Sequence, residues 1–120
     1  YGTTTYVEMM KIISDHCESV GVEPVFYQSN HEGDLVDKIQ EAYFTKADGI
    51  VINPGAYTHT SVAILDALKS VNILTAEVHI SKVEEREDFR QVSFIRQACI
   101  GTITGLGTDG YLRAIDKLEE

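Results

Sequence analysis

The sequence predicts a doubly wound α/β fold, in which helices cover both faces of a parallel sheet. Apolar residues recur at helical spacing in four segments, and short β-prone runs separate these segments. One run, Gly49 to Ile52, is apolar throughout, as a strand covered on both faces must be. Alternating helices and strands imply parallel pairing through right-handed crossovers, which gives a three-layer sandwich. The 120 residues suffice for one domain, residues 1–120, and no linker or repeat divides them.

The first helix is predicted to begin after Thr5. Thr5 and Glu8 have the spacing of a capping box, and apolar residues then recur every three or four positions as far as Gly21, a typical helix stop. The next run, Val22 to Gln28, is β-prone, although Pro24 lies near its start. We therefore expect a helix followed by a strand.

A second helix is predicted from a second capping pair, Ser29 and Glu32. The apolar strand at 49–52 follows it, and after a loop the residues from Thr60 to Val71 have the pattern of a third helix. The run from Ile73 to Val78 predicts another strand.

The last third of the chain begins with a charged stretch from Lys82 to Arg90. A strand is predicted near Cys99 to Thr104, and the sequence GLGTDG then leads into a helix that carries Tyr111. Because the alternation of elements starts on a helix and Tyr1 is not a methionine, we expect one further strand before Tyr1, absent from this sequence.

The sequence GLGTDG, from Gly105 to Gly110, matches the GxGxxG pattern of dinucleotide-binding folds. That fingerprint requires a second strand with an acidic residue about 20 positions on, whereas ten residues follow Gly110 here. We interpret the motif as a glycine-lined turn that leads into the last helix, and not as a cofactor site.

The charge of the chain restricts its partners. Its 10 Lys and Arg against 19 Asp and Glu give a net charge of −9, which repels nucleic-acid backbones and anionic lipid surfaces. No apolar run approaches the roughly 20 residues of a membrane span, and no signal-peptide pattern is present. We expect a cytoplasmic protein that binds a small molecule and neither nucleic acid nor membrane.

Cys17 and Cys99 lie among apolar neighbours and are predicted to be buried thiols.

Ligands of an open parallel sheet bind beyond the carboxyl ends of its strands, and two loops qualify there. The first is NPGAYTHTS, from Asn53 to Ser61, which follows the strand at 49–52. Gly55 lets the backbone approach a ligand, and the free N–H groups of the following helix suit a small anion. His59 is either a ligand contact or a structural, capping histidine.

The second loop is EVHIS, in which His79 interrupts an apolar run at the point where the strand leaves the core. His79 can donate a proton to a substrate, or bond a neighbouring carbonyl in a structural role. Ile80 and Ser81 add backbone donors and a hydroxyl that could hold a carboxylate.

Three further predictions concern charged residues and metals. Arg90 is either a substrate ligand or part of a solvated charged face. Asp66 follows His59 by seven positions, so we expect both on one helix face, where Asp66 could orient a donor or reach a neighbouring subunit. His59, Asp66 and His79 show no metal-ligand spacing such as HExxH. The GxSxG pattern of serine hydrolases is absent. The alternative that uses these three residues is a metal-dependent hydrolase, which a chelator would inactivate.

Six motifs occur in order along the chain: YG at Tyr1, QSNHEG from Gln28, NPGAYTHTS from Asn53, EVHIS from Glu77, EREDFR from Glu85 and GLGTDGY from Gly105. Together they resemble type II 3-dehydroquinate dehydratase over essentially all 120 residues. The resemblance implies a flavodoxin-like sheet, catalysis without metal or organic cofactor, and a homo-oligomer, a dodecamer built from trimers. Departures such as Lys82, where the family usually has Asn, remove no catalytic group.

The reaction that the resemblance implies is the anti elimination of water from 3-dehydroquinate through an enolate, which gives 3-dehydroshikimate. The pathway is shikimate biosynthesis or quinate breakdown. In the family a tyrosine followed by glycine removes the C2 proton, and it matches Tyr1; the histidine of VHIS, here His79, donates a proton to the departing C1 hydroxyl. A phenol with a pKa near ~10 needs a nearby cation to act as a base at neutral pH.

The resemblance also assigns the substrate-binding residues. Asn53, His59 and Arg90 are expected to contact the ring hydroxyls or the carboxylate of the substrate. Ile80 and Ser81 are expected to hold the carboxylate, and Asp66 to act across a subunit contact. The family's first strand, its mobile lid and the arginine that activates the tyrosine precede Tyr1 and are not in this sequence. We therefore expect a longer natural protein, with an intact mass above 13.3 kDa.

The competing hypothesis is a non-enzymatic flavodoxin-like binding module. A receiver module of this fold would need a phosphorylatable Asp at the end of the strand at 49–52, and Asn53 stands there instead. The dehydratase hypothesis predicts that a conjugated enone product accumulates when 3-dehydroquinate is added.

Overall fold

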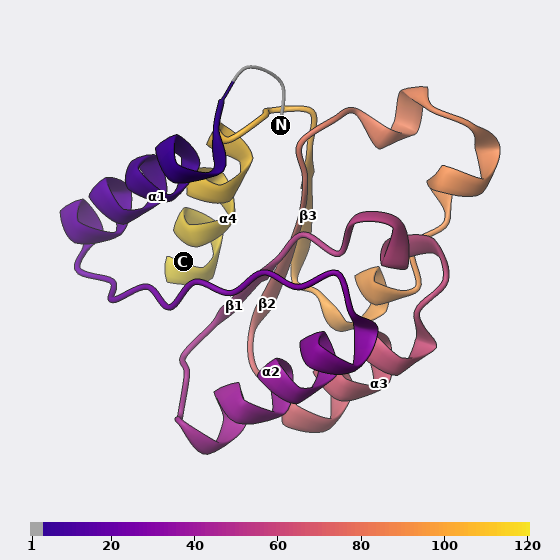
Figure 1. Ribbon diagram of the computed structural model, residues 1–120, viewed down its shortest axis with the longest axis horizontal. Helices are drawn as coiled ribbons and strands as arrows, with labels where there is room; N and C mark the ends of the chain where they lie inside the picture. Colours follow the sequence, from indigo (N-terminus) through magenta and orange to yellow (C-terminus); the bar gives the residue numbers. More distant parts are fainter. Residues whose placement is uncertain (1–3) are drawn as a thin grey trace.

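The sheet of this protein has three parallel strands in the order β1-β2-β3, in a computed structural model that describes residues 4–120 (Figure 1). β1 (Ile50–Ile52) pairs with β2 (Thr75–His79), which pairs in turn with β3 (Gly101–Thr104). Every residue of β2 is buried, since this strand has a neighbour on each side, whereas β1 and β3 are half-buried. The predicted parallel α/β architecture is confirmed.

Helices cover both faces of the sheet, as Figure 1 shows. The four α-helices of the described residues are α1 (Tyr6–Val20), α2 (Glu32–Phe44), α3 (Val62–Val71) and α4 (Asp109–Glu119). α1 and α4 pack together on one face, and α2 and α3 pack together on the other. The core between α2, α3 and β1 centres on Ile39, Ile64 and Leu68, and Ile13 and Ile115 join α1 to α4. These two cores give the predicted three layers.

The start and end of α1 are as predicted. The Thr5 hydroxyl accepts a hydrogen bond from the Glu8 N–H at 3.1 Å, and the Glu8 carboxylate accepts one from the Thr5 N–H. Gly21 ends the helix with φ +77°, in the left-handed region that glycine occupies without strain. Both signals lie within a few residues of the helix ends, so local sequence is enough to define this helix.

The strand predicted from Val22 to Gln28 is wrong. Its side chains alternate between half-buried and exposed, as those of a strand would. However, between Glu23 and Gln28 the backbone makes no backbone hydrogen bond within the part of the chain that the structure describes. A strand needs a hydrogen-bonded neighbour, and a local pattern cannot supply one.

The capping pair predicted for α2 is also wrong, although the helix itself is present. His31 stands at the N-cap without a side-chain cap. The Ser29 hydroxyl donates to the Asp34 carboxylate at 2.9 Å, and the Glu32 carboxylate accepts from the Ser61 hydroxyl at 2.6 Å. The Glu32 carboxylate, which a capping box would have used, instead binds Ser61 at the start of α3.

The helix predicted from Thr60 to Val71 is present as α3, which begins two residues later than expected. A 3₁₀ turn, η1 (Gly55–His59), precedes α3, and the two are separate elements because Thr60 and Ser61 are not helical. His59 therefore belongs to η1 and Asp66 to α3, so the prediction that both share one helix face is wrong.

Replacing Ser61 with Ala should lower the free energy of unfolding by about 1–2 kcal/mol. The buried Ser61 hydroxyl accepts from the Ile64 N–H at 2.9 Å as the N-cap of α3 and also donates to Glu32. Urea unfolding measures the change. Ser70→Ala, near the other end of α3, removes only an exposed hydroxyl and serves as the matched control; equal effects of both changes would contradict the capping role.

The segment between β2 and β3 is folded into three short 3₁₀ turns: η2 (Val83–Glu85), η3 (Asp88–Gln91) and η4 (Ile95–Ala98). The predicted glycine turn leads into α4 as expected.

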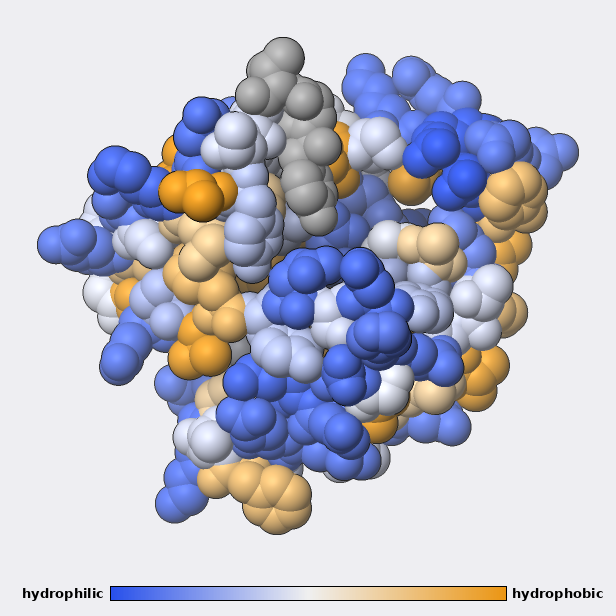
Figure 2. All heavy atoms as spheres, in the orientation of Figure 1, coloured by the Kyte–Doolittle hydropathy of each residue, from blue (hydrophilic) through white to orange (hydrophobic). Residues whose placement is uncertain are grey.

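Of the two free thiols, Cys17 is buried and Cys99 half-buried. Acidic residues are frequent on α2, and Figure 2 shows mainly hydrophilic side chains over that helix. No helix among residues 4–120 is long and apolar enough to cross a membrane.

Candidate active site

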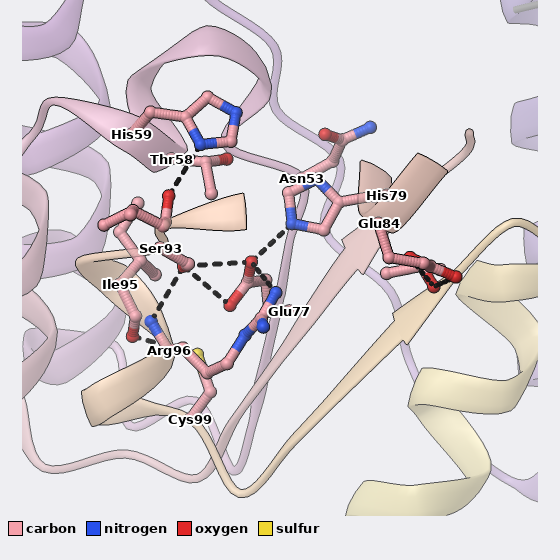
Figure 3. A network of polar contacts seen from close by, with 12 residues as sticks. Asn53, Thr58, His59, Glu77, His79, Glu84, Ser93, Ile95, Arg96 and Cys99 are labelled. Carbon is pink, nitrogen blue, oxygen red and sulfur yellow. Dashed lines mark hydrogen bonds and ion pairs between the residues drawn. The ribbon is translucent and has the colours of Figure 1, made fainter. Parts of the chain in front are cut away.

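The carboxyl ends of β1 and β2 bring the two predicted loops together. Asn53 directly follows β1, and His79 is the last residue of β2. Figure 3 shows their side chains next to each other, with His59 of η1 on the same side of the sheet. The parallel register explains this, because Ile52 lies opposite Glu77 and both strands therefore end at the same edge. The structure thus joins three residues that the sequence separates.

A buried carboxylate lies directly behind His79. The Glu77 side chain is 0% exposed and bonds His79 Nε2 (Figure 3). The Ser93 hydroxyl donates to both Glu77 oxygens, at 3.1 and 3.2 Å, and Arg96 Nη2 lies 3.5 Å from Oε2. Glu77 and His79 share a face of β2 because alternate residues of a strand point the same way. Glu77 therefore fixes the ring of His79 and leaves Nδ1 as the nitrogen outside this pair.

The pKa of Glu77 reflects this network. Burial by itself raises the pKa of a carboxyl group. The hydrogen bond with His79, the charge of that ring and the charge of Arg96 act in the opposite direction, and the pKa of Glu77 is on balance lowered from its ordinary value of 4.5. Glu77 is therefore a carboxylate at neutral pH, and a carboxylate stabilises a protonated imidazole beside it.

Glu77 should make stability depend on pH in the acid range. Because its pKa in the folded state is lowered, its contribution to stability is complete above the ordinary value of 4.5 and is lost as the pH falls through the lower folded value. Urea unfolding between pH 7 and pH 3 should thus show a loss of stability below about pH 4.5 that is smaller in Glu77→Gln. Glu18→Gln, an exposed carboxylate on α1, is the control; parallel curves for Glu77→Gln and the wild type would contradict the assignment.

His59 is held by the segment that follows η3. Its Nδ1 lies 2.7 Å from the Val92 carbonyl, so Nδ1 carries the proton and donates it. Nε2 is then the acceptor in the neutral ring. The Phe89 ring packs edge-on against His59, with 6.4 Å between the centroids. The contact with Val92 is a structural role for His59, and Nε2 remains for a ligand.

The Asn53 amide is fixed by two hydrogen bonds. Its Oδ1 accepts from the Gly55 N–H at 3.1 Å, and its Nδ2 donates to the Tyr111 hydroxyl at 2.9 Å. One amide N–H remains for a ligand. Ile80 and Ser81 follow β2 directly and lie against the glycine turn, because Gly105 and Gly107 donate backbone hydrogen bonds to their carbonyls.

Two predicted site residues, Arg90 and Asp66, have other surroundings. The Arg90 guanidinium pairs with the Glu87 carboxylate at 3.0 Å and lies over the Phe89 ring. The Asp66 side chain is exposed on α3 and has no hydrogen bond or ion pair to another residue within the described range. Tyr1 lies outside the described residues. A role for Arg90 in binding requires exchange of its partner from Glu87 to the ligand.

Glu77, Ser93 and Arg96 were not predicted from the sequence. The period of two between Glu77 and His79 could have indicated the first, since an acidic residue inside an apolar strand run must find a partner. Ser93 and Arg96 are 16 and 19 positions from Glu77, and no local pattern links them to it.

Burial and the charge of Glu77 raise the pKa of the nearby Cys99 thiol to about 12, which keeps this thiol neutral.

A metal centre has no donor set in the described part of the chain. No group of three or more His, Cys, Asp or Glu side chains among residues 4–120 is arranged to hold an ion. His59 and His79 use one nitrogen each for Val92 and Glu77. What the site offers is a histidine backed by a carboxylate, surrounded by hydrogen-bond donors for a small anion.

Comparison with known proteins gives concordant results. The family model described as Dehydroquinase class II matches residues 1–119. The chain is 52% identical over 120 residues to 3-dehydroquinate dehydratase of Caldicellulosiruptor bescii and 54% identical over 122 residues to that of Fusobacterium nucleatum, and it spans 83% of the length of each. The crystal structure of the type II dehydroquinase from Butyrivibrio crossotus superposes with a TM-score of 0.97 at 55% identity, covering 100% of this chain and 83% of that one. The enzyme from Propionibacterium acnes gives 0.92 at 35% identity, covering 98% and 81%.

Proposed function

This chain belongs to the class II dehydroquinase family, and from that membership we propose that it is a 3-dehydroquinate dehydratase of the shikimate pathway. It is a lyase that removes water from 3-dehydroquinate and forms 3-dehydroshikimate. The observation that carries the proposal is the meeting of the NPGAYTHTS loop and the end of EVHIS at one edge of the sheet, beside a buried Glu77–His79 pair. No observation favours a non-enzymatic binding module.

His79 is the general acid in this proposal. Glu77 occupies Nε2, so Nδ1 is the nitrogen that donates a proton to the C1 hydroxyl as the C1–O bond breaks and water leaves. The electron pair of the enolate then forms the C1–C2 double bond, which is conjugated with the C3 carbonyl. The negative charge of Glu77 supports the imidazolium before this step and keeps the ring in one orientation.

The base of the proposed reaction is Tyr1, on the strength of the family resemblance. It takes the proton from C2 and leaves the enolate, whose negative charge is shared with the C3 oxygen. After the reaction the phenol releases its proton to solvent and His79 takes one up from solvent, so the protons balance over one turnover. A phenolate at neutral pH needs a cation close to it.

The substrate is a small carboxylate, and the proposed contacts are donors placed at the strand ends. The Asn53 amide N–H and the backbone N–H groups of Ile80 and Ser81 hold the carboxylate, and His59 accepts from a ring hydroxyl through Nε2. Arg90 contacts the substrate after leaving Glu87. Local donors of this kind let a chain of net charge −9 bind an anion.

The assembly is a homo-oligomer in this proposal, a dodecamer built as a tetramer of trimers, in the cytoplasm. Asp66 is exposed on α3 and is free to act across a subunit contact. Native mass spectrometry tests the assembly, and a subunit number other than twelve would exclude the dodecamer.

The activity is tested by adding 3-dehydroquinate to the enzyme and following the absorbance of the conjugated enone. Steady growth of absorbance that is unchanged by prior treatment with EDTA is the expected result, because no metal takes part in the proposed steps. The absence of product would exclude the dehydratase, and a loss of activity that Zn²⁺ restores would point to a metal-dependent reaction.

A further inference from the structure

The segment GLGTDGY, Gly105 to Tyr111, has no part in the steps above, yet it contacts both halves of the proposed carboxylate site. Its glycine backbone contacts the end of β2, and its tyrosine contacts the residue after β1. Building on the proposed function, we propose that this segment is a positioning element, which aims the N–H groups of Ile80, Ser81 and Asn53 at one acceptor group of the substrate.

The glycine turn sets the direction of two backbone donors. The Gly105 N–H donates to the carbonyls of His79 at 3.2 Å and Ser81 at 3.1 Å, and the Gly107 N–H donates to that of Ile80 at 3.1 Å. In a trans peptide the carbonyl and the following N–H point in opposite directions. Because the His79 and Ile80 carbonyls both face the turn, the N–H groups of Ile80 and Ser81 both point away from it. A regular strand would alternate them, whereas consecutive N–H groups on one side form a site for an anion.

Tyr111 sets the direction of the third donor. A backbone N–H can only donate, so the Gly55 N–H requires the oxygen of the Asn53 amide on its side. The Tyr111 hydroxyl then accepts one of the two amide N–H groups at 2.9 Å, which leaves the other as the group presented to a ligand. The half-buried Tyr111 ring packs in the apolar cores between α1, α4 and the sheet, so its hydroxyl is a fixed point.

Glycine is required at two places in the turn. Gly105 has φ +76°, and a Cβ there would collide with the side chain of Lys82. Gly107 has φ +58° and open space where a Cβ would lie, so an alanine there meets only backbone strain. Gly107→Ala therefore perturbs the turn without a clash, and Gly21→Ala, at φ +77° and equally open, is its matched control at the end of α1.

The first experiment compares Tyr111→Phe with the wild type in the enone assay. Loss of the hydrogen bond to Asn53 should raise KM for 3-dehydroquinate roughly three- to tenfold with kcat nearly unchanged, because that bond acts on substrate binding. Tyr43→Phe, which removes an exposed hydroxyl at the end of α2, should leave KM unchanged. In an Asn53→Ala background the Tyr111→Phe change should raise KM by a smaller factor than in the wild type, since the contact with Asn53 is already lost.

The second experiment compares Gly107→Ala with Gly21→Ala. Both should lower the melting temperature by similar amounts, since both place alanine in the left-handed region. Only Gly107→Ala should raise KM, because it alone shifts the carbonyl contacts of Ile80. Equal KM values for the two variants, or a Tyr111→Phe effect of the same size with and without Asn53, would overturn the positioning role. A wild-type enzyme without dehydratase activity would instead refute the proposed function itself.

Discussion

Replacing His79 with Ala is expected to lower kcat by about 10²–10⁴-fold, the typical contribution of a positioned general acid. The C1 hydroxyl would then have to leave without a proton from the protein, which raises the barrier to C1–O cleavage. Steady-state kinetics in the enone assay measure the change. The fall should appear in both kcat and kcat/KM, because the lost interaction forms only in the transition state.

The structure adds a cost in stability to this variant. His79 is 5% exposed and is the partner of the buried Glu77 carboxylate, so alanine leaves that carboxylate with only Ser93 and Arg96. His79→Gln keeps an amide donor for Glu77 and separates the loss of the acid from the loss of the partner. His16→Ala, which removes a surface histidine bonded to Asp116, is the control for kcat. A folded His79→Gln enzyme with wild-type kcat would refute the role of general acid.

Replacing Glu77 with Ala is expected to lower the free energy of unfolding by about 3 kcal/mol, at the lower end of the range for breaking a buried ion pair. The lower end applies because Arg96 is partly exposed. Three groups lose their common acceptor: His79, Ser93 and Arg96. Urea unfolding at neutral pH measures the effect, and kcat should fall as well because the His79 ring is no longer oriented.

Glu77→Gln separates the charge of this residue from its shape. The amide fills the same volume and can still accept from Ser93, but it no longer supports an imidazolium. We expect most of the stability to return while kcat stays low. Glu84→Ala, which removes an exposed carboxylate bonded to Thr104, is the control for stability and should change it by less than about 0.5 kcal/mol. A Glu77→Ala protein as stable as the wild type would show that the buried network contributes nothing to folding.

Much of the fold could be predicted because the required information is local. The capping box at Thr5 and Glu8 and the stop at Gly21 define α1 within the segment itself. The same kind of reasoning failed at Ser29 and Glu32, because Ser61, 29 positions from Glu32, bonds its carboxylate. It failed again from Val22 to Gln28, where the local pattern is that of a strand but no paired neighbour exists among the described residues.

The candidate site divides in the same way. The sequence by itself determined which residues with useful chemistry stand at the ends of strands, namely Asn53, His79, Ile80 and Ser81, because strand ends follow from the apolar runs before them. Only the tertiary structure decided how these groups are aimed. The Glu77 network, the Val92 carbonyl on His59 and the contacts of Gly105, Gly107 and Tyr111 join positions far apart in the chain. The direction of each of these groups depends on its hydrogen-bond partner, and the tertiary packing decides which partner lies beside it.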